Sequence, residues 1–411
     1  MACGFELKAL VRWSNGVAIR SAETRLLLDA VESDPAIPEL FISHAHFDHS
    51  KGFQFPIQRK HSTKETKELY EVDTSRDAGN WEAIRVGHRL QLGNVEVEAH
   101  DAGHILGSVQ YEIITNDENL VYASHLNFTD TLISKAAEVA PCDTLILEAA
   151  FPPTSQKPSA RETVLATIVR WALNCVSDHR IPTLATEPIG TAQELVRVFN
   201  TWTELPVVVH PKIARVSQVY ENSGVALSYV DAGTERAQAL VEEGKCVVII
   251  PRRFDVTKYA EFRVAYVTAW PTRAEKDIGD VFPLSAQGGL EELLMFVKES
   301  RPKSVYTFRG GSNVLAELIS KRFGIAGRVL SVEAARPQPA APKIDEKAVG
   351  ACEDYLLGLV QTPNLTYEKR ELIARAITEG FKLPLVEEAL TRLEKKNSLK
   401  YSEMTEGYTL P

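Results

Sequence analysis

Short apolar runs separated by polar turns dominate the first 330 residues of the chain. Residues 26–28 and 39–43 are apolar runs of strand length, and the second leads directly into His44. Residues 205–209 form another run of the same kind. These runs predict buried strands, so the residues that follow position 43 are expected on a loop at the end of a strand.

Beyond residue 330 the pattern predicts a separate small domain. Residues 333–343 are rich in proline, which blocks helix and favours extended structure, so we interpret them as a linker. Residues 344–411 show helical periodicity followed by two short strands. The predicted elements are helices at 344–361, 369–379 and 385–396 and strands at 399–401 and 407–410. This order resembles a winged helix.

Charged residues on the third of these helices leave the partner of this domain open. Basic side chains that suit a duplex backbone are Arg392, Lys395, Lys396 and Lys400. Acidic side chains on the same helix are Glu387, Glu388 and Glu394. The mixture is equally typical of a domain that docks on protein or dimerises.

Composition indicates a multidomain globular protein. The 411 residues are 44% hydrophobic and 25% charged, which excludes a disordered or fibrous chain. The five cysteines contain no Cys-x-x-Cys pair, which predicts reduced thiols rather than a disulfide framework. With no signal peptide and no apolar run of membrane length, we expect a cytoplasmic protein without membrane contact. The net charge of −9 argues against broad attraction to nucleic acid but leaves room for a local basic groove.

Candidate metal chemistry concentrates in residues 44–49, which read His-Ala-His-Phe-Asp-His. Three imidazoles and a carboxylate rarely lie so close together, because buried polar groups need partners and a metal ion satisfies all four. His44 and His46 can project toward one ion, while Asp48 and His49 turn toward a neighbouring position. The alternative of solvated loop histidines fits this pattern poorly.

The hexapeptide resembles the His-x-His-x-Asp-His signature of the metallo-β-lactamase superfamily. Residues 101–108 are similar to the superfamily's next motif, and the resemblance implies that His104 is the third ligand of the first metal. Asp29, at the end of its strand, matches an acidic residue that orients a ligating histidine. It is expected to support the site rather than to bind the metal.

Later segments resemble the nucleic-acid-processing β-CASP branch, which includes DNA cross-link repair nucleases, the pre-mRNA 3′-end endonuclease and DNA-ligase-associated exonucleases. Residues 142–151 are similar to the strand that ends in the acidic residue of that branch, here Glu148. The implied fold class is α/β, a metallo-β-lactamase αββα sandwich with an inserted β-CASP-like α/β domain and a C-terminal winged-helix domain. The sandwich would comprise residues 1–164 and 263–332, the insertion 165–262, and the winged helix 344–411.

Three positions depart from the family. His125 stands where an aspartate usually bridges two metals, Gln287 replaces a histidine, and Arg309 replaces another. Asp48 is then the only carboxylate left among the metal ligands, and a neutral imidazole does not readily bridge two ions. We therefore expect one Zn²⁺ ion rather than two. If the alignment is shifted by one residue, His125 is a plain polar residue at a strand end.

The expected ligands and neighbours of the metal are His44, His46, Asp48, His49, His104 and His125. Arg309 could grip a phosphate oxygen and replace part of the lost positive charge, or it could be a structural arginine in a glycine turn.

The resemblance implies an exonuclease-like phosphodiesterase that uses metal-activated water to cleave DNA, with RNA as the alternative substrate. Its candidate catalytic residues are Asp48, Glu148 and Arg309. Four protein ligands tend to close a zinc site, so weak activity is expected. The competing interpretation is an inactive homologue that binds metal and nucleic acid and scaffolds a helicase, a ligase or an active nuclease. A small-molecule metallohydrolase fits the hexapeptide but leaves residues 165–270 and the winged helix unexplained.

Overall fold

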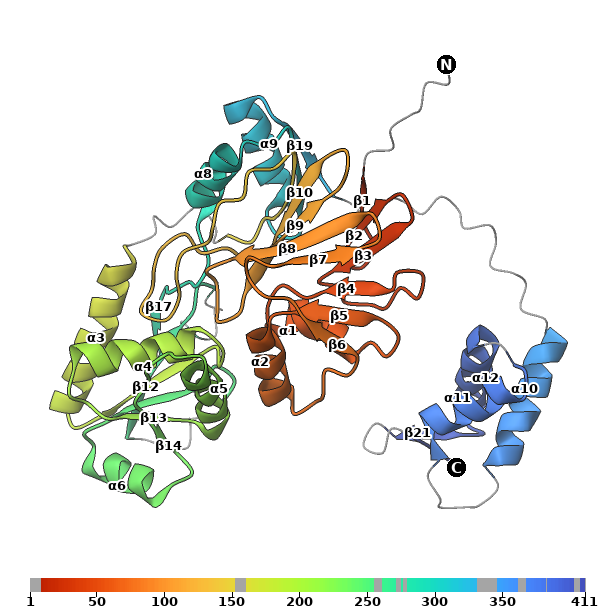
Figure 1. The fold of residues 1–411 in the computed structure, drawn as a ribbon. Helices are drawn as coiled ribbons and strands as arrows, with labels where there is room; N and C mark the ends of the chain where they lie inside the picture. The colour runs from red at the N-terminus through yellow and green to blue at the C-terminus, as the bar shows by residue number, and fades with distance from the viewer. Residues whose placement is uncertain are drawn as a thin grey trace. The chain divides into compact units, whose positions relative to one another are not determined.

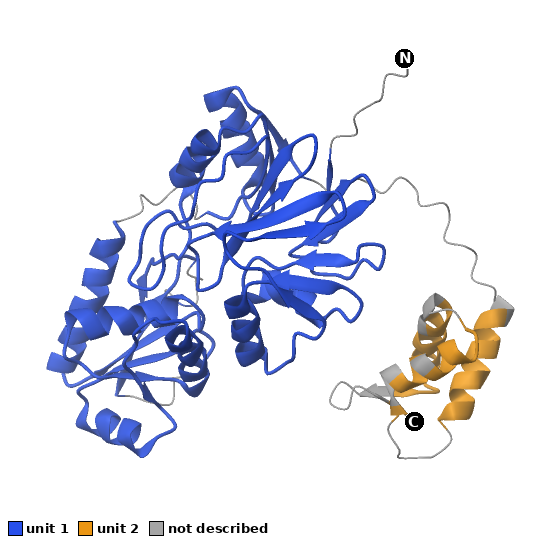
Figure 2. Cartoon of the chain, in the orientation of Figure 1, with its two compact units in different colours: residues 1–333 blue, residues 334–411 orange. Residues whose placement is uncertain are grey.

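The computed structural model describes residues 9–151, 160–254, 261–270, 275, 279–330, 346–360, 367–381, 383–402 and 407–410. It has two compact units, Met1–Glu333 and Ala334–Pro411 (Figure 2). The expected linker at 333–343 lies outside the described residues. Among the helices that the structure describes, none combines the length and apolar character needed to cross a membrane.

Two mixed sheets form the body of the first unit (Figure 1). The first sheet has the strand order β1-β2-β3-β4-β5-β6. Its strands are β1 (Leu10–Trp13), β2 (Val17–Ser21), β3 (Thr24–Leu28), β4 (Glu39–Phe41), β5 (Arg59–Ser62) and β6 (Trp81–Ala83). The second sheet has the order β19-β18-β11-β10-β9-β8-β7. Its strands are β7 (Arg89–Leu92), β8 (Val95–Asp101), β9 (Val109–Ile114), β10 (Asn119–Ala123), β11 (Thr144–Glu148), β18 (Ser304–Phe308) and β19 (Ala326–Val329).

The two sheets pack face to face and helices cover their outer faces. Alternate residues of facing strands, such as Ile19 and Val97, share one buried cluster, as the two-residue period of a strand requires. Helix α2 (Lys64–Thr74) packs Tyr70 against the outside of the first sheet. Helices α8 (Leu290–Ser300) and α9 (Ser312–Phe323) cover the outside of the second. This helix–sheet–sheet–helix arrangement is consistent with the expected metallo-β-lactamase sandwich.

A third sheet, parallel throughout, builds the inserted α/β part. Its order is β14-β13-β15-β12-β16-β17. The strands are β12 (Ile181–Thr186), β13 (Val207–Val209), β14 (Val230–Asp231), β15 (Val247–Pro251), β16 (Phe262–Val267) and β17 (Asp280–Phe282). Helices α3 (Arg161–Ser177), α4 (Thr191–Trp202) and α5 (Pro211–Asn222) pack on one face, and α6 (Glu235–Glu243) packs on the other. Cover on both faces explains the continuous apolar runs of β13 and β15.

The third sheet and its helices extend beyond residues 165 and 262, the boundaries expected for the insertion. Strand β16 pairs with β12 in the register Ile181↔Phe262, and β17 pairs with β16. Helix α3 begins at Arg161 and packs in the core of the same sheet. The third sheet therefore takes residues 161–282. Short strands such as 262–267 look alike in sequence, and only long-range pairing shows which sheet they join.

The second unit contains three helices and a small sheet among its described residues. The helices are α10 (Glu346–Leu359), α11 (Lys369–Thr378) and α12 (Leu383–Lys395). The sheet has the order β20-β22-β21, with β20 (Tyr367–Glu368), β21 (Lys400–Ser402) and β22 (Gly407–Thr409). Val349, Leu356, Leu393 and Tyr408 are fully or almost fully buried in one cluster, so this unit has its own core. Strand β20 was not expected from the sequence.

Candidate metal centre

Four histidines from three loops at strand ends converge on one point. The hexapeptide follows β4, supplies His44 and His46, and then enters the single-turn helix α1 (Phe47–Ser50). His104 lies on the loop between β8 and β9, and His125 follows β10. One ring nitrogen from each of these four histidines lies within 4.8 Å of the others. The structure thus brings together the four imidazoles that the sequence analysis grouped.

Hydrogen bonds fix which nitrogen of His44 is free. Its Nδ1 lies 2.9 Å from Ser43 Oγ, and that hydroxyl donates to Asp29 Oδ2 at 2.5 Å. Ser43 Oγ therefore accepts the Nδ1 proton, which leaves a lone pair on Nε2. His44 Nε2 is buried and has no hydrogen-bond partner among the described residues. An unpaired buried acceptor is costly, and a cation would satisfy it.

His46 and His104 point lone pairs at each other. His104 Nδ1 donates to the carbonyl of Ala286 at 2.8 Å, and His46 Nε2 lies 3.4 Å from the carbonyl of Ile189. The remaining nitrogens, His104 Nε2 and His46 Nδ1, are 3.0 Å apart. Two lone pairs at this distance repel each other unless a proton or a metal ion lies with them. The donor set fits a divalent ion such as zinc.

The turn before α4 brings the inserted part against this site. Gly190 has φ +91°, and a Cβ at this position would lie 2.5 Å from Ile105 Cγ2. Only glycine therefore allows the close approach that places the Ile189 carbonyl beside His46.

Gln287 determines which nitrogen of His125 is available. Its Nε2 lies 2.9 Å from His125 Nδ1, and its buried Oε1 has no hydrogen-bond partner among the described residues. In this amide orientation Nδ1 accepts, so the ring proton sits on Nε2, which lies 3.7 Å from Glu148 Oε1. With the amide turned over, Oε1 accepts the Nδ1 proton and frees Nε2 for a metal.

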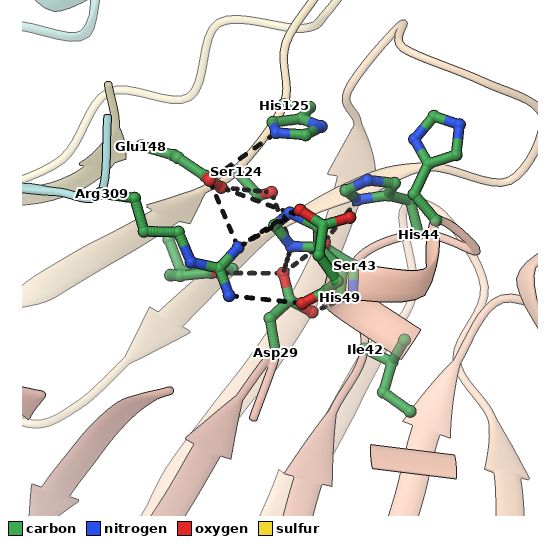
Figure 3. A network of polar contacts seen from close by, with 12 residues as sticks. Asp29, Ile42, Ser43, His44, His49, Ser124, His125, Glu148 and Arg309 are labelled. Carbon is green, nitrogen blue, oxygen red and sulfur yellow. Dashed lines mark hydrogen bonds and ion pairs between the residues drawn. The ribbon is translucent and has the colours of Figure 1, made fainter. Parts of the chain in front are cut away.

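A second group of polar residues, around Arg309, lies next to His44 and His125 (Figure 3). Arg309 places Nη1 3.0 Å from His49 Nε2, 3.3 Å from Glu148 Oε1 and 3.8 Å from Asp48 Oδ2. Asp48, His49 and His125 themselves lie close enough together to hold an ion. The Arg309 guanidinium thus occupies the neighbourhood in which a second ion would meet His49 and Asp48.

Asp29 holds several residues of the site in position through hydrogen bonds. It accepts hydrogen bonds from the Ser43 backbone at 2.7 Å, from His49 Nδ1 at 2.8 Å and from Tyr122 at 2.8 Å, besides the Ser43 hydroxyl. Asp29 and Arg309 both have left-handed backbones, with φ +46° and +53°. Such conformations are uncommon for residues other than glycine and concentrate at functional sites.

Burial and neighbouring charges set the protonation of the centre. Burial lowers the pKa of His44 and His104 well below the usual value and that of His46 to about 4, and repulsion among the imidazoles adds to this. These three rings are therefore neutral near pH 7 and can bind a metal. Burial opposes ionisation of Glu148, but the charges of His49 and His125 outweigh it and lower the pKa to about 2.

His49 experiences two opposing influences. Burial lowers its pKa, while Glu148 and Asp29 outweigh burial and raise it to about 10. The geometry agrees with a protonated ring, because Nδ1–H donates to Asp29 at 2.8 Å and Nε2 lies 3.2 Å from Asp48 Oδ2. Arg309 Nη1, 3.0 Å from the same Nε2, shares the carboxylates of Asp48 and Glu148 with this ring.

The site opens into a cleft of about 330 Å³ between the sandwich and the third sheet. His46, Asp48 and His104 line it, together with residues 284–287 and the segment after β16. The six expected metal residues and Arg309 and Glu148 all lie in or beside this centre. The sequence analysis missed Ser43, Gln287 as a partner of His125, and the cleft residues Phe47 and Trp270. Ser43 directly precedes the hexapeptide, which is the one local signal that could have found it.

Comparisons with known proteins agree with this geometry. No family model matches the chain. It is 27% identical over 310 residues to "Probable DNA ligase" of Opitutus terrae, which covers 68% of this chain and 28% of that protein. It is 23% identical to "RNase J-like protein" of Methanocaldococcus jannaschii, over 55% of this chain and 61% of that one. Cleavage and polyadenylation specificity factor subunit 3 of Dictyostelium discoideum is also 23% identical, over 57% of this chain and 33% of its own length.

The matched region spans less than two thirds of each of these relatives. Among solved structures, a protein of unknown function from Enterococcus faecalis V583 has a TM-score of 0.56 at 14% identity and covers 73% of this chain and 93% of its own. That likeness is one of fold. The chain has metallo-β-lactamase/β-CASP nuclease relatives and a relative named as a DNA ligase, which confirms the resemblance stated from its motifs.

Proposed function

We propose that this chain is a metal-dependent, exonuclease-like phosphodiester hydrolase that acts on DNA, with RNA as the alternative substrate. The observation that carries the proposal is the convergence of His44, His46, His104 and His125 beside an open cleft. The relatives support nucleic acid as the substrate class, and the relative named as a ligase supports DNA.

The residues around the centre can take different roles in the reaction. One bound Zn²⁺ ion would supply Lewis-acid charge and activate water for attack on phosphorus. The Asp48 carboxylate is exposed at the cleft and can orient that water. Arg309 can hold a non-bridging phosphate oxygen, because a guanidinium offers several donors in one plane. The buried Glu148 keeps Arg309 in place through its 3.3 Å ion pair.

A single ion is proposed because of Arg309. Its guanidinium already neutralises Asp48 and Glu148 and contacts the His49 nitrogen that a second ion would use. A second divalent ion there would face a fixed positive charge within a few ångströms, which is unfavourable in a buried site.

The same contacts favour a second candidate function, a metal-binding subunit without catalysis. Arg309 is engaged by protein carboxylates and Gln287 stands in place of a ligand, so the site could be stable and inactive. In that case the chain would bind nucleic acid and scaffold a helicase, a ligase or an active nuclease.

The second unit fits a winged helix used for docking better than one used for duplex binding. Arg392 lies 2.7 Å from Glu388, and Lys396 lies 2.6 Å from Glu353. Two of its four basic candidates are therefore paired within the unit. Lys395 and Lys400 remain exposed.

One experiment separates the two functions. Metal content per chain is measured by elemental analysis, and the same preparation is tested on single-stranded and duplex DNA and RNA. About one zinc with cleavage that EDTA abolishes supports the hydrolase. About one zinc without cleavage of any substrate supports the scaffold, and a metal-free protein contradicts both.

A further inference from the structure

Two exposed aromatic rings line the same cleft as the metal residues. Phe47 is 61% exposed and lies between His46 and Asp48 in the hexapeptide. Trp270 is 42% exposed and follows β16 of the third sheet. Both belong to the cleft lining together with His46, Asp48 and His104. Large aromatic side chains left open to solvent at a polar site indicate a surface that binds a flat apolar partner.

Hydrogen bonds hold the backbone of Trp270 in place. Its carbonyl accepts a 2.8 Å hydrogen bond from Arg252 Nη2, and its N–H donates to Thr268 Oγ1 at 3.3 Å. Arg252 is itself fixed by Glu275 through two hydrogen bonds, one of 2.7 Å from Nη2 to Oε2. On the other side, Lys51 Nζ lies 5.2 Å from the centre of the Phe47 ring. A fixed backbone at Trp270 reduces the conformational entropy that is lost on binding.

The charges of the cleft argue against capture of a duplex backbone. Among its described lining residues the charged ones are Asp48, Glu187 and Arg252. Arg252 is committed to Glu275 and also lies 3.6 Å from Glu187. Duplex binding depends on lysine and arginine that neutralise several phosphates, and this lining supplies no free cation for that purpose. Aromatic rings that stack on bases need no such charge, and every unpaired base offers a face.

We propose that Phe47 and Trp270 form a base-stacking subsite that takes an unpaired nucleotide at the end of a single strand. A base stacked there lies in the cleft that also contains His46, Asp48 and His104, so the adjoining phosphodiester is delivered to the metal centre. This deepens the proposed function, because it makes a single-stranded end the form of nucleic acid that the site accepts. A base inside a duplex is already stacked and paired, and reaching the rings would first require its extrusion.

The test measures binding, so that its outcome is independent of turnover. Full-length protein with its metal bound is titrated with a fluorescein-labelled ten-nucleotide oligo(dT) and with a blunt duplex of the same length, both with phosphorothioate linkages that resist cleavage. Phe47→Leu and Trp270→Leu remove the aromatic face but keep apolar volume. Trp202→Leu is the matched control, because Trp202 is 41% exposed on α4 and does not belong to the cleft lining.

Each cleft variant is expected to weaken oligo(dT) binding roughly 5- to 150-fold, the range for loss of one base–aromatic stack, while Trp202→Leu leaves it unchanged. Oligo(dT) should also quench the fluorescence of the unmodified protein, and Trp270→Leu should lose that quenching. Equal affinity of all variants, or tighter binding of the blunt duplex than of oligo(dT), overturns the inference. If the protein binds oligo(dT) through the two rings but does not cleave unmodified nucleic acid, the stacking subsite is supported and the proposed hydrolase activity is contradicted.

Discussion

Arg309 and His49 are 260 residues apart in the chain, yet Arg309 Nη1 lies 3.0 Å from His49 Nε2. The other nitrogen of His49 is held by Asp29 at 2.8 Å. The ring therefore has one fixed donor and one nitrogen that faces a guanidinium. The Arg309 guanidinium therefore lies on the side of the centre where Asp48 and His49 could otherwise bind a second metal ion.

Restoring the three altered positions together should create a two-metal site. His125→Asp supplies a bridging carboxylate, Gln287→His supplies an imidazole, and Arg309→His removes the competing cation. The triple variant is expected to bind about two metal ions per chain by elemental analysis and to gain phosphodiesterase activity. Arg309→His alone serves as control and should not raise activity to the same extent. A triple variant that stays at one ion and stays inactive would favour a pure binding role.

If the natural protein cleaves nucleic acid, loss of the Arg309 charge should slow it. Arg309→Ala is expected to lower the rate by a factor of roughly 10 to 1,000, as for removal of one preorganised charge stabiliser, and Asp48→Ala should abolish cleavage. Arg309→Lys keeps the charge but loses the planar guanidinium group, so its rate should lie between those of the natural protein and Arg309→Ala. Rates are measured with saturating oligonucleotide. An unchanged rate in Arg309→Ala would show that this residue is structural.

Removing two ligands should release the metal and lower stability. His44→Ala with His46→Ala leaves His104 and His125 without enough partners for tight binding. With zinc on the order of 100 to 1,000 times its dissociation constant, the lost binding corresponds to about 3 to 4 kcal/mol of unfolding free energy. Elemental analysis and thermal unfolding with and without EDTA check this. His88→Ala, at an exposed histidine outside the cluster, should change neither.

The metal-free protein should lose stability as the pH falls below neutrality. The pKa of His46 is lowered from 6.5 to about 4 in the folded chain, so between these values the unfolded chain binds more protons. The contribution of His46 to the free energy of unfolding is therefore complete above about pH 6.5 and declines toward pH 4. Between pH 7 and 5, His46 alone should account for a loss of up to about 2 kcal/mol. Urea unfolding in EDTA at several pH values measures this. His46→Gln cannot titrate and should flatten the profile, and an equally steep profile in that variant would contradict the assignment.

Residues 344–411 should fold when produced alone. Val349, Leu356, Leu393 and Tyr408 build a core without help from the first unit. The fragment is expected to show helical circular dichroism and a cooperative thermal transition. Leu393→Asp places a charge in that core and should abolish the transition. A fragment that is unfolded in its natural sequence would show that the second unit depends on the first.

The sequence by itself determined the local features of this protein. A metal site could be predicted at residues 44–49 because the candidate ligands lie within six consecutive residues. The apolar run that precedes them predicted a strand. The four imidazoles that the structure brings together were grouped through motifs that each occupy a short segment. The helices of the second unit followed from their periodicity, since amphipathic spacing depends only on nearby residues.

Only the tertiary structure decided the relationships between distant segments. It assigned β16 to the third sheet by pairing with β12, which no local pattern predicts. It placed Gln287 against His125, 162 residues away, and Arg309 against His49. It also opened the cleft in which Phe47 and Trp270 meet the metal residues. Such contacts arise from the packing of whole sheets, because the free energy of burying two side chains together does not depend on how far apart they are in the sequence. Hydrophobic periodicity, in contrast, depends only on residues that are near one another in the chain.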